Sequence, residues 1–504
     1  MTSKARRERR EHREGELARR PARTGDREVD RRDDRSDDRS DGGRAGGRRT
    51  GGGRPQGARR APAGAAGAAA GLAPAATAGD ASLGRTVGLA VGLCLAAIGV
   101  IVLVFGVLHR WYGLHYPWSG ALHWVYGLHD ISDTTIYFDY AGRMAHGFRP
   151  YVDFPVEYPP LAIPLFIIPG HTNSLIAYTD WFNVEMYAML TGAAAATAAA
   201  AVRLWPKGRS ATVVAIAFAA CVLATGAIVG NRYDAAVALV LALFLLLMAY
   251  GKWTVACLVL GIGFALKLTP AIMLPLVFVL AVERRTILWG CLYFFLGAFL
   301  PFVPFLANGT KGLEYIFTYH LQRPLQVESV LATPLLFGSV IGKVWVEIGT
   351  AYGSQFVAAT GATTLARLSG YFELIALAVT YWLIWQRRGA LRARPGLVPL
   401  AVLAVILAFM TWGKVLSPQY FIWLLPAVAL IVVERRVLGA VLVGVLLLTQ
   451  IEFPAHYWTF IYLEHGSVMI VVVRNVLLVV AFGLSLWHLW RLPDAAGGSR
   501  LSPR

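Results

Sequence analysis

The chain has 504 residues, of which 56% are hydrophobic and 15% are charged, and its mean hydropathy is +0.54. A soluble domain carries about 25% charged residues, so this composition excludes a single water-soluble globule and predicts an integral membrane protein. The formal net charge of +17 is unevenly placed, because residues 1–60 hold 20 Lys and Arg against 12 Asp and Glu.

The first predicted segment, residues 1–84, is a cytoplasmic tail without a folded core. Residues 1–60 have almost no aliphatic and no aromatic side chains, and residues 61–84 continue as an Ala/Gly/Pro linker. Such a segment cannot bury enough apolar surface to offset its chain entropy. An Arg-rich tail could bind nucleic acid, but interleaved acids and the lack of stacking aromatics favour a solvated tail. We therefore expect membrane lipids, and no nucleic acid, among the partners.

Residues 85–491 are predicted to form an all-α polytopic membrane domain of about a dozen transmembrane helices, followed by a short cytoplasmic tail at 492–504. A spanning helix needs about 20 apolar residues. Long apolar runs occupy 86–108, 183–204, 211–229, 233–250, 287–306, 368–386, 437–453 and 468–490. Shorter or Pro-interrupted runs that we also expect to cross lie at 253–267, 270–282, 397–412 and 420–433.

Basic residues between these runs predict the orientation of the domain. Lys and Arg are enriched in cytoplasmic loops, and a cytoplasmic N-terminus places every basic group between the runs on that side. Both termini are then cytoplasmic, and the long loops 109–182, about 307–367 and 455–467 face outward. Their polar residues suit an enzyme that acts on a substrate held at the outer surface, because a transporter would keep such residues near the bilayer midplane.

The apolar stretch 157–170 is an exception to this scheme. Its 14 residues would reach only about 21 Å as a helix, whereas the hydrocarbon core is about 30 Å thick. Four prolines also interrupt regular helix in it. We expect an interfacial or re-entrant segment on the outer side.

The first outer loop carries the candidate catalytic residues. The spacing of its apolar residues predicts a short amphipathic helix over about 133–146, ended by Gly147. Asp133 and Tyr137 then share one face near its start. An ionised Asp can take a proton from a sugar hydroxyl as that oxygen attacks an anomeric carbon. Asp133 could equally be only the N-cap of this helix, and its position alone does not decide.

Cationic residues near other outward-facing helix ends are candidates for binding a phosphate leaving group. The second outer loop has a dense polar cluster that includes His320 and Arg323, although loop hydrogen bonding would also explain it. Lys267 and Lys414 have no acid close to them in the sequence. Charges so near hydrocarbon usually face a cavity or a partner, which favours an anionic ligand for both.

Three further charges lie in or beside apolar runs. Arg474, inside the last run, also lacks an acid close in sequence. Arg232 and Asp234 are near enough to each other to form a simple ion pair. The missing acid favours an anionic ligand for Arg474 as well, whereas Arg232 and Asp234 could simply neutralise each other.

Nucleotide and metal motifs are missing from the sequence. It has no P-loop, no GxGxxG after a strand-like run, no HExxH and no CxxC. No soluble segment is long enough for a doubly wound nucleotide-binding domain. We expect no cofactor and no metal, and a donor activated by a lipid phosphate rather than by a nucleotide.

Five strings, in chain order, resemble one known family. They are SDTTIYFDYAGRMAHGFRPYVDFPVEYPP, GNRYDAAVALVLALFLL, GIGFALKLTPAIMLPL, YHLQRPLQVES and KVLSPQYFIWLLP. With the topology, they are similar to the polyprenyl-phosphate-dependent membrane glycosyltransferases of the GT-C class, and most similar to glycosyltransferase family 87, a bacterial mannosyltransferase-like group. The resemblance covers most of residues 86–490 and not the tail.

The resemblance implies a GT-C-like bundle with an outward cavity and a single carboxylate of the first outer loop acting as base, without an essential metal. The family's aspartate, followed four residues later by Tyr, matches Asp133 and Tyr137, and Tyr137 would orient the acceptor hydroxyl. The family's donor-phosphate histidine falls at His320. Because several acids crowd this loop, Asp130 and Asp139 stay open as alternative bases.

The resulting hypothesis is the transfer of a sugar, expected to be mannose, from a polyprenyl-phosphate donor to an acceptor glycan or glycolipid on the outer leaflet of a bacterial plasma membrane. Lys267, Arg323 and Lys414 would help to bind the donor phosphate. Two alternatives stay open. The donor could be a polyprenyl-phosphate arabinofuranose or glucose, or the protein could be a non-catalytic transporter of lipid-linked sugars.

Overall fold

The computed structural model describes residues 132–206, 210–306 and 310–493, together with seven isolated positions between residues 84 and 99. All of these belong to one compact unit of the chain, Ala69–Arg504. Residues 1–83 of the predicted tail, Asp130 and most of the expected span 86–108 lie outside the described residues.

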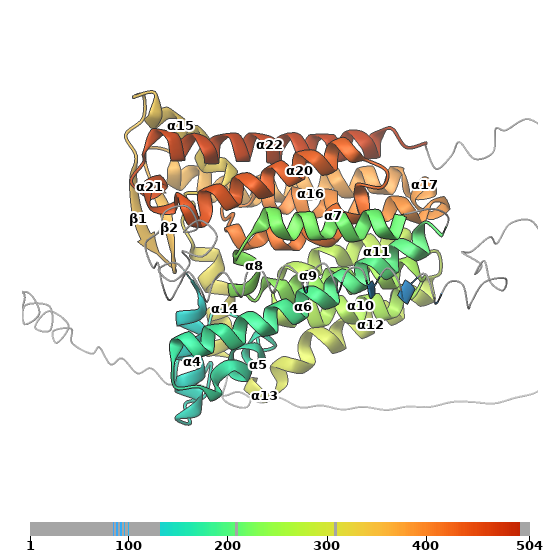
Figure 1. Cartoon of the computed structure of the whole chain (residues 1–504), viewed down its shortest axis with the longest axis horizontal. Helices are drawn as coiled ribbons and strands as arrows, with labels where there is room; N and C mark the ends of the chain where they lie inside the picture. The colour runs from blue at the N-terminus through green and yellow to red at the C-terminus, as the bar shows by residue number, and fades with distance from the viewer. Residues whose placement is uncertain are drawn as a thin grey trace, which may run out of the picture. The chain divides into compact units, whose positions relative to one another are not determined.

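Long apolar helices make up most of this unit (Figure 1). The described part of the chain has six helical segments long and apolar enough to cross a membrane. They are Leu175–Leu204, Arg284–Leu306, Ala362–Gln386, Pro395–Trp412, Arg436–Ala455 and His465–Trp490. These helices indicate a membrane protein, and the expected total of about a dozen crossings stays a prediction.

The helices that fill these segments begin and end close to the predicted runs. The helices of the six segments are α6 Leu175–Leu204, α12 Arg284–Phe299, α16 Ala362–Gln386, α18 Val398–Trp412, α20 Arg436–Gln450 and α22 His465–Trp490. Further apolar helices are α7 Ser210–Thr225, α9 Asp234–Ala249, α10 Trp253–Leu266, α11 Leu274–Leu280 and α19 Leu425–Ile431. Helix α6 starts eight residues before the predicted run, because its first turns are amphipathic rather than uniformly apolar.

Packing within the unit places α18 at its centre. Helix α18 contacts α16, α19 and α22, and it is apolar on all sides, as expected for a helix without a solvent face. Helices α10 and α12 cross closely because glycine faces backbone at both positions: a Cβ on Gly261 would lie 2.2 Å from the Phe294 carbonyl oxygen, and one on Gly297 would lie 2.7 Å from the Leu258 carbonyl oxygen.

The stretch 157–170 contains only short helices, as predicted. Helix α5, Ala162–Ile167, is followed by the 3-10 turn η1, Ile168–His171. Its Phe166 carbonyl accepts a 2.9 Å hydrogen bond from the Tyr178 hydroxyl at the start of α6. Helix α5 is therefore fixed against α6 instead of crossing on its own.

Several short elements gather at one end of the helices (Figure 1). They are α4 Thr134–Ala145, α14 Lys311–Gln322, α15 Thr333–Val340, α21 Tyr457–Ile461 and the antiparallel hairpin β1 Glu347–Ala351 and β2 Ser354–Ala358. Helix α4 confirms the predicted helix over 133–146, and Gly147 follows it with φ +86°. The sequence did not predict the hairpin. Helix α17, Arg388–Ala393, with its basic residues, lies at the opposite end (Figure 1).

Candidate active site

A cavity of about 1260 Å³ opens at the end that carries α4, α14 and the hairpin. Its walls come from these elements, from the 3-10 helix η2 Thr269–Met273, from one face of α16 and from the loop that follows α18. Nine charged residues line it: Asp133, Glu157, Arg232, Lys267, Arg323, Glu328, Arg367, Glu373 and Lys414. Both the acidic and the basic side chains come from segments that lie far apart in the sequence.

Asp133 lies where the backbone of α4 begins, but its side chain does not cap the helix. The Thr134 N–H donates instead to the Ser132 hydroxyl at 3.2 Å. The Asp133 carboxylate is 3.2 Å from Arg232 Nε, and its side chain is 24% exposed, toward the cavity that it lines. The carboxylate is therefore available to a ligand, which the N-cap interpretation would not allow.

Tyr137 supports this carboxylate from the protein side. Its hydroxyl lies 3.5 Å from Asp133 Oδ2, its ring stacks on Phe166 with the centroids 4.2 Å apart, and the side chain is fully buried. Tyr137 is not among the residues that line the cavity. This geometry places it behind the carboxylate rather than beside an incoming ligand.

The other two acids considered as bases are placed differently. Asp139 is on the exposed face of α4, where its carboxylate is 2.8 Å from Arg143 Nε, and it does not line the cavity. Asp130 lies outside the described residues. Of the two candidates within the described residues, Asp133 lines the cavity and Asp139 does not.

The GNRYD segment supplies one charge to each of two ion pairs. Arg232 pairs with Asp133, whereas Asp234, at the start of α9, pairs with Lys267 at 2.7 Å. Trp423 Nε1 also donates to Asp234 at 2.6 Å. The simple Arg232–Asp234 pair that the sequence allowed is therefore wrong, and Lys267 does have an acidic partner.

Lys267 still lines the cavity after this pairing. Its ammonium lies 4.6 Å from the Tyr233 ring centroid, with the rings of Tyr420 and Trp423 slightly farther away. The aromatic faces and the Asp234 carboxylate hold the charge at a fixed point. A fixed cation at the wall of a cavity can stabilise an anionic ligand group.

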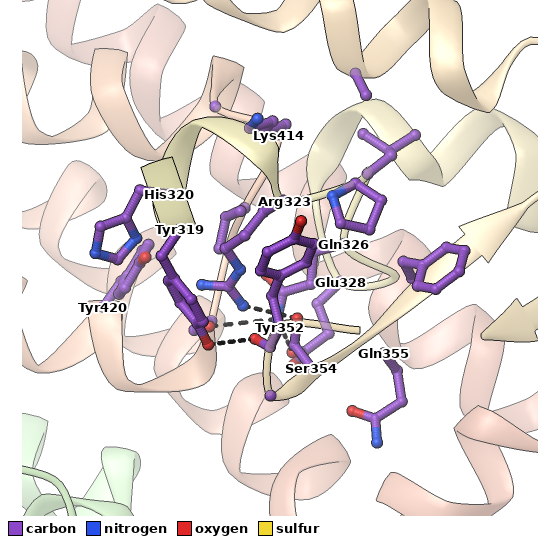
Figure 2. A pocket seen from close by; sticks show the side chains of 18 of the residues that line it. Tyr319, His320, Arg323, Gln326, Glu328, Tyr352, Ser354, Gln355, Lys414 and Tyr420 are labelled. Atoms are coloured by element: carbon purple, nitrogen blue, oxygen red, sulfur yellow. Dashed lines mark hydrogen bonds between the residues drawn. The ribbon is translucent and has the colours of Figure 1, made fainter. Parts of the chain in front are cut away.

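His320 and Arg323 lie at the C-terminal end of α14, close to the hairpin (Figure 2). Burial, followed by the charges of Arg323 and Lys267, lowers the pKa of His320 to about 4. The imidazole is therefore neutral at physiological pH and can donate one hydrogen bond. Arg323 Nη2 donates to the Ser354 hydroxyl at 2.7 Å, and its buried Nε has no hydrogen-bond partner among the described residues.

Lys414 completes the cationic group of the cavity. Its ammonium donates to the Leu321 carbonyl at 2.6 Å, so it fixes the end of α14 that carries His320 and Arg323. Burial and the neighbouring Arg323 lower the pKa of Lys414. His320 and the cations Lys267, Arg323 and Lys414, all proposed from the sequence, thus line one cavity with Asp133.

Two parts of the site were missed by sequence reasoning. Glu157, counted only as one acid of its loop, lines the cavity and accepts a 2.5 Å hydrogen bond from Tyr140; burial raises the pKa of its carboxyl. The hairpin contributes Tyr352, Ser354 and Gln355 to the wall. No local pattern marks these residues, because their partners are distant in the sequence.

Arg474, which lacks an acid close in sequence, is paired in the structure. Its guanidinium lies 3.2 Å from Glu452 Oε2 and 3.7 Å from Glu328 Oε1, and it donates to the Glu328 carbonyl at 2.8 Å. All three side chains are buried. This cluster ties α22 to the loop that precedes α15, so Arg474 supports the cavity wall.

Metal-ligating side chains do not cluster in the part of the chain that the structure describes: no three His, Cys, Asp or Glu residues there could share an ion. Among the carboxylates of the cavity, Asp133 and Glu328 lie near arginines, and Glu157 accepts a hydrogen bond from Tyr140. Independence from a metal or other cofactor stays a prediction.

Comparison with known proteins gives one family. The family model of glycosyltransferase family 87 matches residues 156–370. This range contains Arg232, Lys267, His320, Arg323 and the hairpin, and it lies between Asp133 and Lys414 in the sequence. No curated protein and no solved structure matches the chain.

Proposed function

From the assignment of this chain to glycosyltransferase family 87 by residues 156–370, which makes it a membrane glycosyltransferase, we propose that it transfers a sugar from a polyprenyl-phosphate donor to a glycan or glycolipid. The sugar is mannose, and the acceptor is on the outer leaflet of a bacterial plasma membrane. One observation carries the proposal: a single cavity holds an accessible carboxylate and a group of cations.

The carboxylate is the base. Asp133 takes the proton from an acceptor hydroxyl while that oxygen forms a bond to the anomeric carbon of the donor. The bond from this carbon to the phosphate oxygen breaks, and its electron pair leaves with the polyprenyl phosphate. Phosphate is stable as an anion, so the departing oxygen needs no strong general acid.

The cations bind the phosphate. Arg323, whose buried Nε has no hydrogen-bond partner within the described ranges, and Lys267, held by Asp234, stabilise the charge that grows on the phosphate during transfer. The neutral His320 adds a hydrogen-bond donor, and Lys414 fixes the end of α14. These groups stabilise the transition state more than the ground state, because the phosphate gains charge as it leaves.

Two residues position the base. Arg232 is buried and 3.2 Å from the Asp133 carboxylate, and Tyr137 lies behind the same carboxylate. We therefore assign Tyr137 to orienting Asp133 rather than the acceptor. A base held at a fixed angle reaches the acceptor hydroxyl without first losing side-chain entropy.

The proposed orientation follows from the two ends of the helix bundle. The basic helix α17 lies at the end opposite the hairpin (Figure 1). Basic segments favour the cytoplasmic side, which supports a cavity on the outer face and a lipid-linked donor.

The decisive experiment is incubation of the purified protein with labelled polyprenyl-phosphate mannose, glucose or arabinofuranose and a mixture of outer-leaflet glycolipids. We expect mannose to appear in a new glycosidic product. If only glucose or only arabinofuranose entered the product, the protein would be a transferase with a different donor sugar. If the intact donor crossed the proteoliposome membrane and no glycosidic bond formed, the protein would be a transporter and the proposal would be wrong.

A further inference from the structure

A line of aromatic rings leads away from Asp133 along one wall of the cavity. The guanidinium of Arg232, which contacts Asp133, lies 5.7 Å from the Phe453 ring centroid. The Phe453 and Tyr457 centroids are 5.2 Å apart, and those of Tyr457 and Trp458 are 5.5 Å apart, both edge to face. These rings come from the turn Ile451–Ala455, labelled η7, and from α21.

The exposure of the three rings changes along this line. Phe453 and Tyr457 are only 5% and 7% exposed, whereas Trp458 is 44% exposed, and all three line the cavity. The inner rings are therefore packed into the protein, and the indole offers an open face farther from the base. Beside them, the Gln355 side chain accepts a hydrogen bond from the Tyr457 hydroxyl.

The charges of this wall differ from those of the phosphate side. The charged groups that act on the Tyr457 hydroxyl are Glu328, Glu452, Arg232 and Asp133. Arg232 is the cation among these four, and its guanidinium already faces the Asp133 carboxylate. An anionic group would thus find no available counter-charge here, whereas a neutral sugar ring offers C–H groups for an aromatic face and hydroxyls for an amide.

We propose that the aromatic wall of Phe453, Tyr457 and Trp458 binds the acceptor, and that this acceptor is a neutral oligosaccharide. Its terminal sugar lies beside Asp133, and the sugar that precedes it stacks on the Trp458 indole. The proposal rests on the proposed function for the place of the terminal sugar, because the attacking hydroxyl must lie within hydrogen-bond reach of the base.

The test compares acceptors of two lengths with the variant Trp458→Ala. We expect the KM for a neutral oligosaccharide acceptor to rise by about three- to tenfold, the range for one lost aromatic contact. The KM for a simple monosaccharide glycoside and the KM for the donor should stay unchanged. A KM for the longer acceptor that does not move, or an equal rise for both acceptors, would overturn the assignment of Trp458.

Two matched variants separate stacking from general damage. Trp458→Phe keeps an aromatic face and should restore most of the lost affinity. Trp345→Ala removes an equally large side chain that is 81% exposed near the hairpin and does not line the cavity, so it should leave every KM unchanged. A Trp345→Ala effect as large as that of Trp458→Ala would contradict a specific subsite.

A binding measurement keeps this proposal separate from the reaction. Calorimetric titration of the native protein with a neutral oligosaccharide should show binding that Trp458→Ala weakens. If the native protein transferred no sugar but still bound the oligosaccharide through Trp458, the proposed function would fail and the subsite would stand. Absence of binding in the native protein would refute the subsite.

Discussion

At the scale of single residues, the surroundings of the Asp133 carboxylate carry most of the argument. Arg232 and Tyr137 approach it from the protein, and its remaining exposed surface faces the cavity. Spacing and resemblance favoured Asp133 in the sequence but left Asp130 and Asp139 open as alternatives. The contact between Arg232 and Asp133 was not predictable, because Asp234 is closer to Arg232 in the sequence. Only the tertiary packing pairs Asp234 with Lys267 and leaves Arg232 to Asp133.

The variant Asp133→Asn keeps the size of the side chain and a hydrogen-bond acceptor for Arg232, but it cannot take a proton at neutral pH. We expect transfer to fall by at least about 100-fold, the usual contribution of a general base, while the protein still inserts and folds. The measurement is turnover of labelled lipid-linked sugar by the purified variant. Asp139→Asn, on the exposed face of α4, is the matched control. Normal turnover in Asp133→Asn would eliminate Asp133 as the base.

His320 predicts a pH dependence of stability. Its pKa is lowered to about 4 in the folded protein, against about 6.5 in the unfolded chain. Between these values the unfolded chain binds a proton that the folded protein does not, so the free energy of unfolding decreases as the pH falls from about 6.5 to 4. The variant His320→Gln lacks this group. Thermal unfolding in detergent should show a smaller loss between pH 6.5 and 4 in the variant, and identical losses would contradict a buried neutral imidazole.

At the scale of elements, one face of α16 extends the cavity along the helix. Ala362, Ala366, Gly370 and Leu374 follow each other at intervals of four and all line the cavity. Helix α16 is apolar, and only 28% of the residues in its apolar 18-residue stretch are buried inside the protein. In the proposed function, this face of α16 offers a route along the helix for the tail of the lipid donor.

The variant Gly370→Leu tests this route. A Cβ at Gly370 meets no atom within 4 Å, so the larger side chain fits the fold but projects into the open space. We expect the KM for a long-chain polyprenyl-phosphate donor to rise by about tenfold, the scale expected when about 1.4 kcal/mol of tail contact is lost. A short-chain analogue of the donor should be much less affected.

The control for this variant is Gly483→Leu on α22. An added Cβ at Gly483 also meets no atom within 4 Å, and Gly483 does not line the cavity of the candidate active site. It should leave both KM values unchanged. Equal effects of Gly370→Leu on long and short donors would show that the α16 face does not carry the tail.

Helices and hairpin differ in how far the sequence predicts them. The bounds of α9, α10 and α22 lie within a few residues of the predicted apolar runs, because uniform hydropathy is a local property of the chain. The hairpin has no comparable signal: β2 is held by hydrogen bonds such as Val357 N–H to the Leu325 carbonyl at 3.0 Å. That pairing joins residues more than thirty positions apart, and only the folded chain creates it.

At the scale of the whole molecule, the proposed function requires the hairpin end to face outward. We expect a cysteine introduced by Trp345→Cys to react with a membrane-impermeant maleimide in intact cells, because the native side chain is 81% exposed near the hairpin. A cysteine introduced by Arg388→Cys, at the start of α17, should react only after the membrane is opened. The native protein gives the background from its own cysteines. The reverse labelling pattern would put the cavity in the cytosol and make a lipid-linked donor at the outer face impossible.

The start of α9 has a mechanical consequence for both halves of the site. Arg232 and Asp234 are separated by one residue, yet Arg232 contacts Asp133 and Asp234 contacts Lys267. A small tilt of this helix end would therefore change both distances together. In the proposed mechanism one contact positions the base and the other positions a phosphate-binding cation, so a movement of α9 that alters the first also alters the second.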